Sequence, residues 1–116
     1  MFRLISKGIA TAALLCSGFY PQISYGETFK SAEFVKWSEE NRTFYLTTAI
    51  GMAGLIARRN NASQGDCIDH WFFDDQGRAD GQILAVMAEY PDHHPQGIIL
   101  AVLEKQCGKL IYSAPN

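Results

Sequence analysis

Two cysteines, Cys67 and Cys107, carry the clearest chemical signal in this 116-residue chain. The third cysteine, Cys16, lies in an N-terminal stretch that has the composition of an export signal. Export would leave Cys67 and Cys107 as the only thiols of the mature protein in an oxidising compartment, where such a pair forms a disulfide. We therefore expect a Cys67–Cys107 disulfide, which leaves neither thiol free to act as a nucleophile.

The histidines and their neighbouring aspartates are the candidate metal ligands, in Asp69-His70 and in Asp92-His93-His94. Adjacent side chains of a helix point about 100° apart, and no His-x3-His pair places two ligands on one face. The alternative, which we favour, is that Asp92, His93 and His94 form a solvated turn that caps the following helix. We therefore predict no metal site and no cofactor.

Signals for catalysis are weaker still. No Gly-x-Ser-x-Gly or comparable setting marks an activated serine. The acidic pairs Glu39-Glu40 and Asp74-Asp75 lie in polar stretches, where the usual explanation is a solvated surface rather than the burial that a catalytic acid needs. We predict that the protein is not an enzyme, and we assign no catalytic residue.

The first 26 residues have the parts of a secretory signal: basic Arg3 and Lys7, a short apolar run, and small residues before a cleavage site at Glu27. The apolar run is shorter than the roughly 20 residues of a membrane-spanning helix, so we expect a cleaved signal and not an integral membrane protein. Removing residues 1–26 leaves 8 basic residues against 12 acidic ones, a net charge of −4, which argues against nucleic-acid binding. We therefore predict a single periplasmic domain, residues 27–116.

A lipoprotein is the alternative to a cleaved signal. Leu14-Leu15-Cys16 is similar to a lipoprotein processing site, with Cys16 as the acylated residue. The bulky Leu15 directly before Cys16 disfavours this alternative, because processing sites require small residues.

The spacing of apolar residues predicts helices throughout the mature chain. A first helix is expected from Ser31, which would cap it. The longest periodic segment, residues 43–59, places an apolar stripe on one face, which we expect to face the core. Its two glycines, Gly51 and Gly54, indicate close approach of a neighbouring helix. The stripe consists of Tyr45, Ala49, Met52, Ala53 and Ile56.

Local signals place the later helices. Residues 60–65 are predicted to be a loop, followed by a short helix through Phe72 that Asp66 caps. Another helix is expected over residues 80–90, with Ile83, Val86, Met87 and Tyr90 facing inward. Pro95 would begin the last helix and Gly108 would end it. The predicted fold is all-α, a small bundle of four to five short helices stapled by one disulfide.

Three consecutive aromatic residues are the best candidates for binding. Trp71, Phe72 and Phe73 cannot all face the core from one short helix, so at least one is expected at the surface beside Asp74 and Asp75. Together with the predicted turn, these residues form our candidate partner-binding set; the alternative is that they are core residues with Phe73 half covered. The set is Trp71, Phe73, Asp74, Asp75, Asp92, His93 and His94.

The order of four short stretches resembles the Rap/Tai-type immunity protein family, and the segment 45–57 is similar to that family's glycine-containing first long helix. The stretches are Asp66-Cys67-Ile68, Gly81-Gln82-Ile83-Leu84-Ala85-Val86, Tyr90-Pro91-Asp92-His93-His94-Pro95 and Ala101-Val102-Leu103-Glu104-Lys105-Gln106-Cys107. The resemblance covers residues 43–108. One departure is Ser38, where similar proteins often carry a further cysteine.

This resemblance implies a small periplasmic helical protein with a Cys67–Cys107 disulfide. It further implies an immunity protein that occludes the cleft of a peptidoglycan amidase toxin of a type VI secretion system, and a homodimer. A periplasmic acid-stress chaperone is the alternative function, but such proteins are rich in lysine and this chain is not. An adaptor subunit of a cell-envelope complex is a third interpretation.

Overall fold

The computed structural model describes residues 29–111, which form five helices and no strand. The predicted signal peptide, residues 1–26, and Cys16 lie outside the described residues. The helices are α2 (Ser31–Phe34), α3 (Glu39–Asn60), α4 (Ala62–Phe73), α5 (Gln76–Glu89) and α6 (Pro95–Cys107). The predicted all-α class is confirmed.

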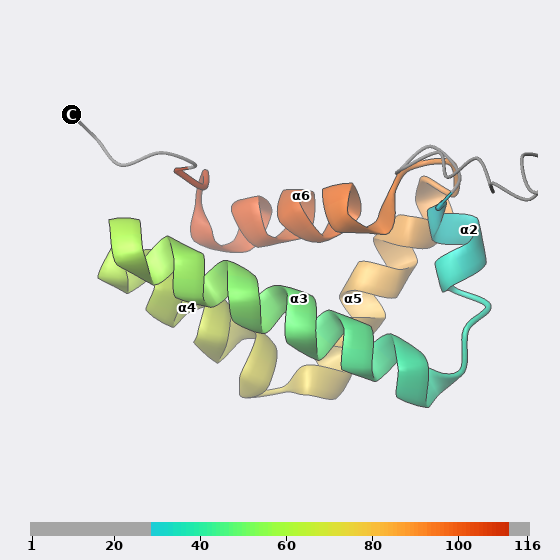
Figure 1. Ribbon diagram of the computed structural model, residues 1–116, viewed down its shortest axis with the longest axis horizontal. Coiled ribbons are helices and arrows are strands. Elements are labelled where there is room, and N and C mark those ends of the chain that lie inside the picture. The colour runs from blue at the N-terminus through green and yellow to red at the C-terminus, as the bar shows by residue number, and fades with distance from the viewer. Residues whose placement is uncertain (1–28, 112–116) are drawn as a thin grey trace, which may run out of the picture.

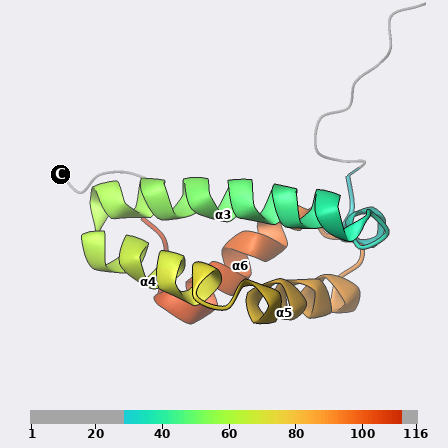
Figure 2. The same cartoon turned by 90° about the horizontal axis from the view of Figure 1, so that it is seen from below.

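The helices form two layers joined by α6. Figure 2 shows α3 alone on one side and α4 followed by α5 on the other, while Figure 1 shows α6 along one edge. Side chains from every helix meet between the layers, and the largest fully buried ones include Phe34, Leu46, Phe72, Met87 and Leu103. This arrangement leaves the whole side of α3 that faces away from α4 and α5 without a covering helix.

Two glycines allow α4 to pack closely along α3. A Cβ atom added at Gly65 would lie 2.8 Å from the Cα of Arg58, and one added at Gly54 would lie 2.5 Å from Oδ1 of Asp69. Real Cβ atoms do not approach other heavy atoms so closely, so Gly65, which faces backbone, requires glycine at this helix spacing, whereas a side chain at Gly54 would force the carboxylate of Asp69 to shift. The close approach predicted at Gly54 is confirmed, but the one predicted at Gly51 is wrong, because a Cβ atom there would meet only Cζ of Phe73 at 4.0 Å. Among the described helices, α3 and α4 share the most extensive contact.

The Cys67–Cys107 disulfide is present, as predicted, with its Cα atoms 5.8 Å apart. It joins the middle of α4 to the last residue of α6. Buried Gln64 holds the same end of α6, because its Nε2 donates to the carbonyl oxygens of Gly108 at 3.0 Å and Lys109 at 2.9 Å. A covalent bond and a polar clamp, one helical turn apart on α4, therefore fix where α6 ends.

Helix boundaries follow side-chain caps, and some differ from those predicted. His94 caps α6, Pro95 begins it, and Gly108 with φ 89° follows it, all as expected. Asn61 rather than Asp66 caps α4, so the predicted loop over residues 60–65 is wrong. Asp66 instead lies 2.7 Å from the guanidinium of Arg58.

The predicted cap at Ser31 is also wrong. The N-cap position of α2 is occupied by Lys30, and the Ser31 hydroxyl donates to the carbonyl oxygen of His93 at 2.7 Å. This bond, together with one from the Ser31 amide, fastens α2 to the turn between α5 and α6.

The predicted core stripe of α3 is correct in part, because Tyr45, Ala49 and Ala53 are partly buried and pack against the core. The buried side chains of α3 are Leu46, Ile50 and Ala57, with Gly54 between them. Met52 and Ile56, which we expected to face the core, are exposed. Tyr90, expected to face inward from α5, is exposed as well, because it lies beyond the end of the helix.

Candidate binding surfaces

The turn between α4 and α5 carries the first group of predicted site residues. Phe73 is 45 % exposed, and its ring meets the ring of Phe72 edge to face at 4.9 Å between centroids. Oδ2 of Asp74 lies 3.1 Å from Nδ1 of His70, and Asp75 caps α5 by accepting from the backbone amide of Arg78. The turn therefore presents an exposed aromatic ring next to two acidic side chains that are held in place.

Trp71 lies beside this turn but is largely covered. The guanidinium of Arg78 sits 5.7 Å from the centre of the Trp71 ring and also donates to the Trp71 carbonyl oxygen at 3.0 Å. The indole Nε1 is buried, and no residue between 29 and 111 accepts a hydrogen bond from it. Trp71 is thus packed against Arg78, and Phe73 is the aromatic residue of this turn that is exposed to solvent.

The turn between α5 and α6 carries the second predicted group. His94 accepts from the amide of Gln96 at 3.1 Å and so caps α6, and the carboxylate of Asp92 lies 3.7 Å from Nζ of Lys30. The main chain of His93 holds α2, as described above. The solvated turn and helix cap that we favoured over a metal site therefore match the observed hydrogen bonds.

The two predicted groups do not form one surface. They flank the opposite ends of α5, whose 14 residues span about 20 Å. A single partner reaching both would need a large footprint. The structure brings together Phe73, Asp74 and Asp75 and separates them from Asp92, His93 and His94.

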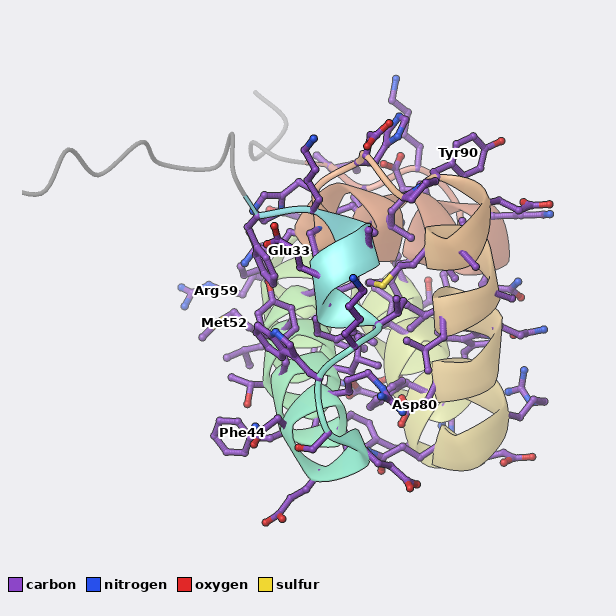
Figure 3. The ribbon with its side chains drawn as sticks, turned by 90° about the vertical axis from the view of Figure 1, so that its right-hand side faces the viewer. Glu33, Phe44, Met52, Arg59, Asp80 and Tyr90 are labelled. Carbon is purple, nitrogen blue, oxygen red and sulfur yellow. A yellow bond between two sulfur atoms is a disulfide. The ribbon has the colours of Figure 1, made fainter. Side chains whose placement is uncertain are left out.

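A third surface, which sequence analysis missed, is the outer face of α3. We define it as the exposed residues opposite the buried stripe of that helix. Figure 3 shows three of its members, Phe44, Met52 and Arg59, projecting to the same side of the molecule. The four apolar members are exposed by 75 % (Phe44), 55 % (Met52), 57 % (Leu55) and 52 % (Ile56). The full set is Asn41, Phe44, Thr48, Met52, Leu55, Ile56 and Arg59.

An apolar groove of about 280 Å³ lies along this face, between α3 and α6. Met52 and Ile56 form its α3 side, Leu100 and Gln96 form its α6 side, and Ile111 lies at one end. Asn60 positions that end by donating to the carbonyl oxygen of Ile111 at 2.9 Å. Met52 and Ile56, which we assigned to the core, thus line a groove that solvent can enter.

Two charged residues have displaced pKa values: Arg58, which is exposed, and Asp80, which is partly buried and has one carboxylate oxygen without a hydrogen-bond partner among the described residues. Hydrogen bonds to Asp69 and then Asp66 raise the pKa of Arg58 above its usual value. Partial burial raises the pKa of Asp80, against the opposing effect of nearby Arg42. Arg42 itself donates to the carbonyl oxygens of Val35 and Trp37, so it fastens the loop that follows α2.

Two further findings concern residues 29–111 only. No group of three or more histidine, cysteine, aspartate or glutamate side chains gathers there as metal ligands would. None of the helices in that range combines the length and apolar character needed to cross a bilayer.

Comparisons of this chain with protein-family models, with curated proteins and with solved structures find no match. The resemblance to immunity proteins therefore rests on the stretches quoted above. The function is argued below from that resemblance and from the surfaces of the bundle.

Proposed function

We propose that the chain is an exported, non-catalytic inhibitor that binds its target with the turn between α4 and α5. One observation carries the proposal: Phe73 stands exposed beside Asp74 and Asp75 on a turn that His70 and Arg78 hold in place. An exposed aromatic anchor beside charged groups is typical of protein-binding hot spots. A binding element that is already rigid also loses little entropy on association.

The disulfide supports this role in two ways. It is the kind of bond expected in a protein that works outside the cytoplasm. It also joins α4 to α6, so that α4, the helix that precedes the binding turn, keeps its position in the bundle when a partner binds. A rigid bundle that inserts a turn can block an enzyme cleft without chemistry of its own.

The resemblance names the target class, a peptidoglycan amidase toxin delivered by type VI secretion. An acidic turn suits the cleft of an enzyme whose surface is basic, because opposite charges speed association and favour the right orientation. Periplasmic localisation follows from the same proposal, since the substrate of such a toxin lies in the cell wall.

The experiment has two stages. The mature oxidised protein is used as bait for secreted and periplasmic proteins of its own and neighbouring bacteria, and any partner is then assayed for cleavage of peptidoglycan. A single partner whose amidase activity falls to zero at stoichiometric amounts of the protein supports the proposal. Capture of many unrelated proteins, increasing at acid pH, supports an acid-stress chaperone instead, and a non-enzymatic envelope partner supports an adaptor.

Charge reversal tests the role of the turn. D74R is expected to weaken binding of the partner at least tenfold, because it replaces an exposed acidic group at the centre of the contact. Glu89, exposed at the far end of α5, provides the matched control, and E89R should bind like the wild type. Equal affinities for D74R and the wild type would place the contact elsewhere on the molecule.

A further inference from the structure

We infer that the groove between α3 and α6 binds one saturated fatty acid of medium chain length, with its carboxylate at the end of the groove near Ile111. The inference rests on the residues of this groove and not on the proposed inhibitor function. The groove has a volume of about 280 Å³, and of the described residues that line it only Gln96 has a polar side chain. Concave, mostly apolar sites with few polar groups are typical of small-molecule binding.

The lining favours a flexible apolar chain over a peptide. Met52, Ile56 and Leu100 form walls of methyl and methylene groups, and buried Ile99 and Leu110 lie beneath them. A peptide in this groove would turn main-chain amides toward apolar walls that offer no hydrogen-bond partner, which is costly. A saturated chain has no polar atoms to satisfy, and each methylene that it buries contributes to binding.

The dimensions of the groove indicate the length of the chain. An apolar cavity of about 150 Å³ holds the six carbons of benzene, so the groove accommodates about eleven carbons. Along α3, the wall from Ala49 to Ile56 spans about 10 Å, roughly the length of an extended chain of ten carbons. Decanoate is therefore the fatty acid that we expect to fit best.

Charge places the carboxylate. Met52, Ile56 and Arg59 follow one another at helical spacing, so Arg59 extends the α3 wall of the groove by one turn (Figure 3). Arg59 is exposed and forms no ion pair with a described residue. The next residue, Asn60, donates to the carbonyl oxygen of Ile111, which lines the groove. A cation that is free to pair with a ligand therefore lies at this end.

The other charges near this end leave it positive. Lys109 is exposed and directly precedes Leu110, which lines the groove. Glu104 is partly buried and follows Leu100 by one turn of α6, so it lies toward the same end. Arg59 and Lys109 outnumber this one carboxylate, whereas Glu40 lies in the first turn of α3, at the opposite end of that helix. The charge distribution therefore favours an anionic head at the Ile111 end.

An NMR titration of the isotope-labelled, mature oxidised protein with decanoate tests the inference, below the critical micelle concentration of decanoate and with no protein partner present. Amide shifts should be confined to residues along the groove, such as Ile56, Leu100 and Ile111, with a dissociation constant of about 0.1–1 mM, as expected for a small ligand in an open groove. Butanoate should cause no such shifts, because it buries too few methylenes. Tetradecanoate should bind no more than threefold more tightly than decanoate, because the groove is already filled.

Adjacent residues of α3 provide a matched pair of variants. I56E places a carboxylate in the groove wall and should raise the dissociation constant of decanoate at least fivefold. L55E adds the same charge at a residue of similar exposure, 57 % against 52 %, that does not line the groove, so its dissociation constant should stay within twofold of the wild type. Both residues are more than half exposed, so far-ultraviolet circular dichroism should be unchanged in both variants.

An uncharged ligand of the same length tests the position of the carboxylate. R59E should raise the dissociation constant of decanoate at least fivefold but that of decan-1-ol less than twofold, because only decanoate carries a charge. A wild type that does not bind decanoate, an equal loss of affinity in I56E and L55E, or an R59E variant that weakens both ligands equally would each overturn the inference. Because the titration contains no amidase, its failure would leave the proposed inhibitor function standing.

Discussion

Removal of the Cys67–Cys107 disulfide should cost this domain a large share of its stability. The bond closes a loop with a sequence separation of 40, for which the chain-entropy relation gives about 4 kcal/mol at 25 °C. A domain of this size is typically stable by roughly 4–12 kcal/mol in total. The variant C67S/C107S is therefore expected to be marginally folded at 25 °C and substantially unfolded at 37 °C.

Urea unfolding followed by circular dichroism measures this loss. With a slope of about 1–2 kcal/mol per M for a small domain, a loss near 4 kcal/mol moves the midpoint by roughly 2–4 M. Reduction of the wild type with dithiothreitol should move it by a similar amount, which separates loss of the bond from any effect of the serines. The Gln64 clamp should keep the end of α6 near α4 as long as the variant is folded.

A loss below about 1 kcal/mol would refute this reasoning. Such a result would mean that the reduced, unfolded chain already keeps α4 and α6 together, so that closing the loop removes little entropy. An increase in hydrogen exchange confined to the end of α6, without a change in global stability, would lead to the same conclusion.

Three further predictions concern single residues. G65A should destabilise the domain by about 2–3 kcal/mol in urea unfolding, because its Cβ would meet the backbone of Arg58. G81A is the control: its Cβ meets nothing within 4 Å, so it should stabilise the domain by up to about 1 kcal/mol. Equal effects of the two substitutions would contradict the close packing of α3 on α4. Q64M keeps the volume of the side chain at position 64 but removes the hydrogen bonds that Gln64 donates to Gly108 and Lys109. It should therefore lower the free energy of unfolding by about 1 kcal/mol and speed amide hydrogen exchange at the end of α6. Unchanged exchange would argue against the Gln64 clamp. D80N should raise the melting temperature at pH 7, because it removes a charge that the folded state disfavours: the pKa of Asp80 is raised by burial. The wild type gains relative stability as pH falls through that pKa, since the carboxyl becomes neutral. The advantage of D80N in melting temperature should therefore shrink toward pH 4.

Local signals were sufficient for much of the fold. Pro95 and Gly108 mark the ends of α6 because their backbone preferences act within one turn, and the predicted disulfide follows from counting thiols in an oxidising compartment. These features depend on few neighbours, so the sequence alone determined them, together with the all-α class.

Only the tertiary structure decided which side of α3 faces the core. Apolar residues lie on both sides of this helix, so periodicity placed Tyr45, Ala49 and Ala53 against the core correctly but could not tell that Met52 and Ile56 face solvent. The choice depends on where α4 can approach, and that depends on Gly54 and Gly65, whose missing side chains matter only once two helices meet. The structure also sets the two predicted binding turns at opposite ends of α5, because the 14 residues between them form a single helix that holds the turns apart.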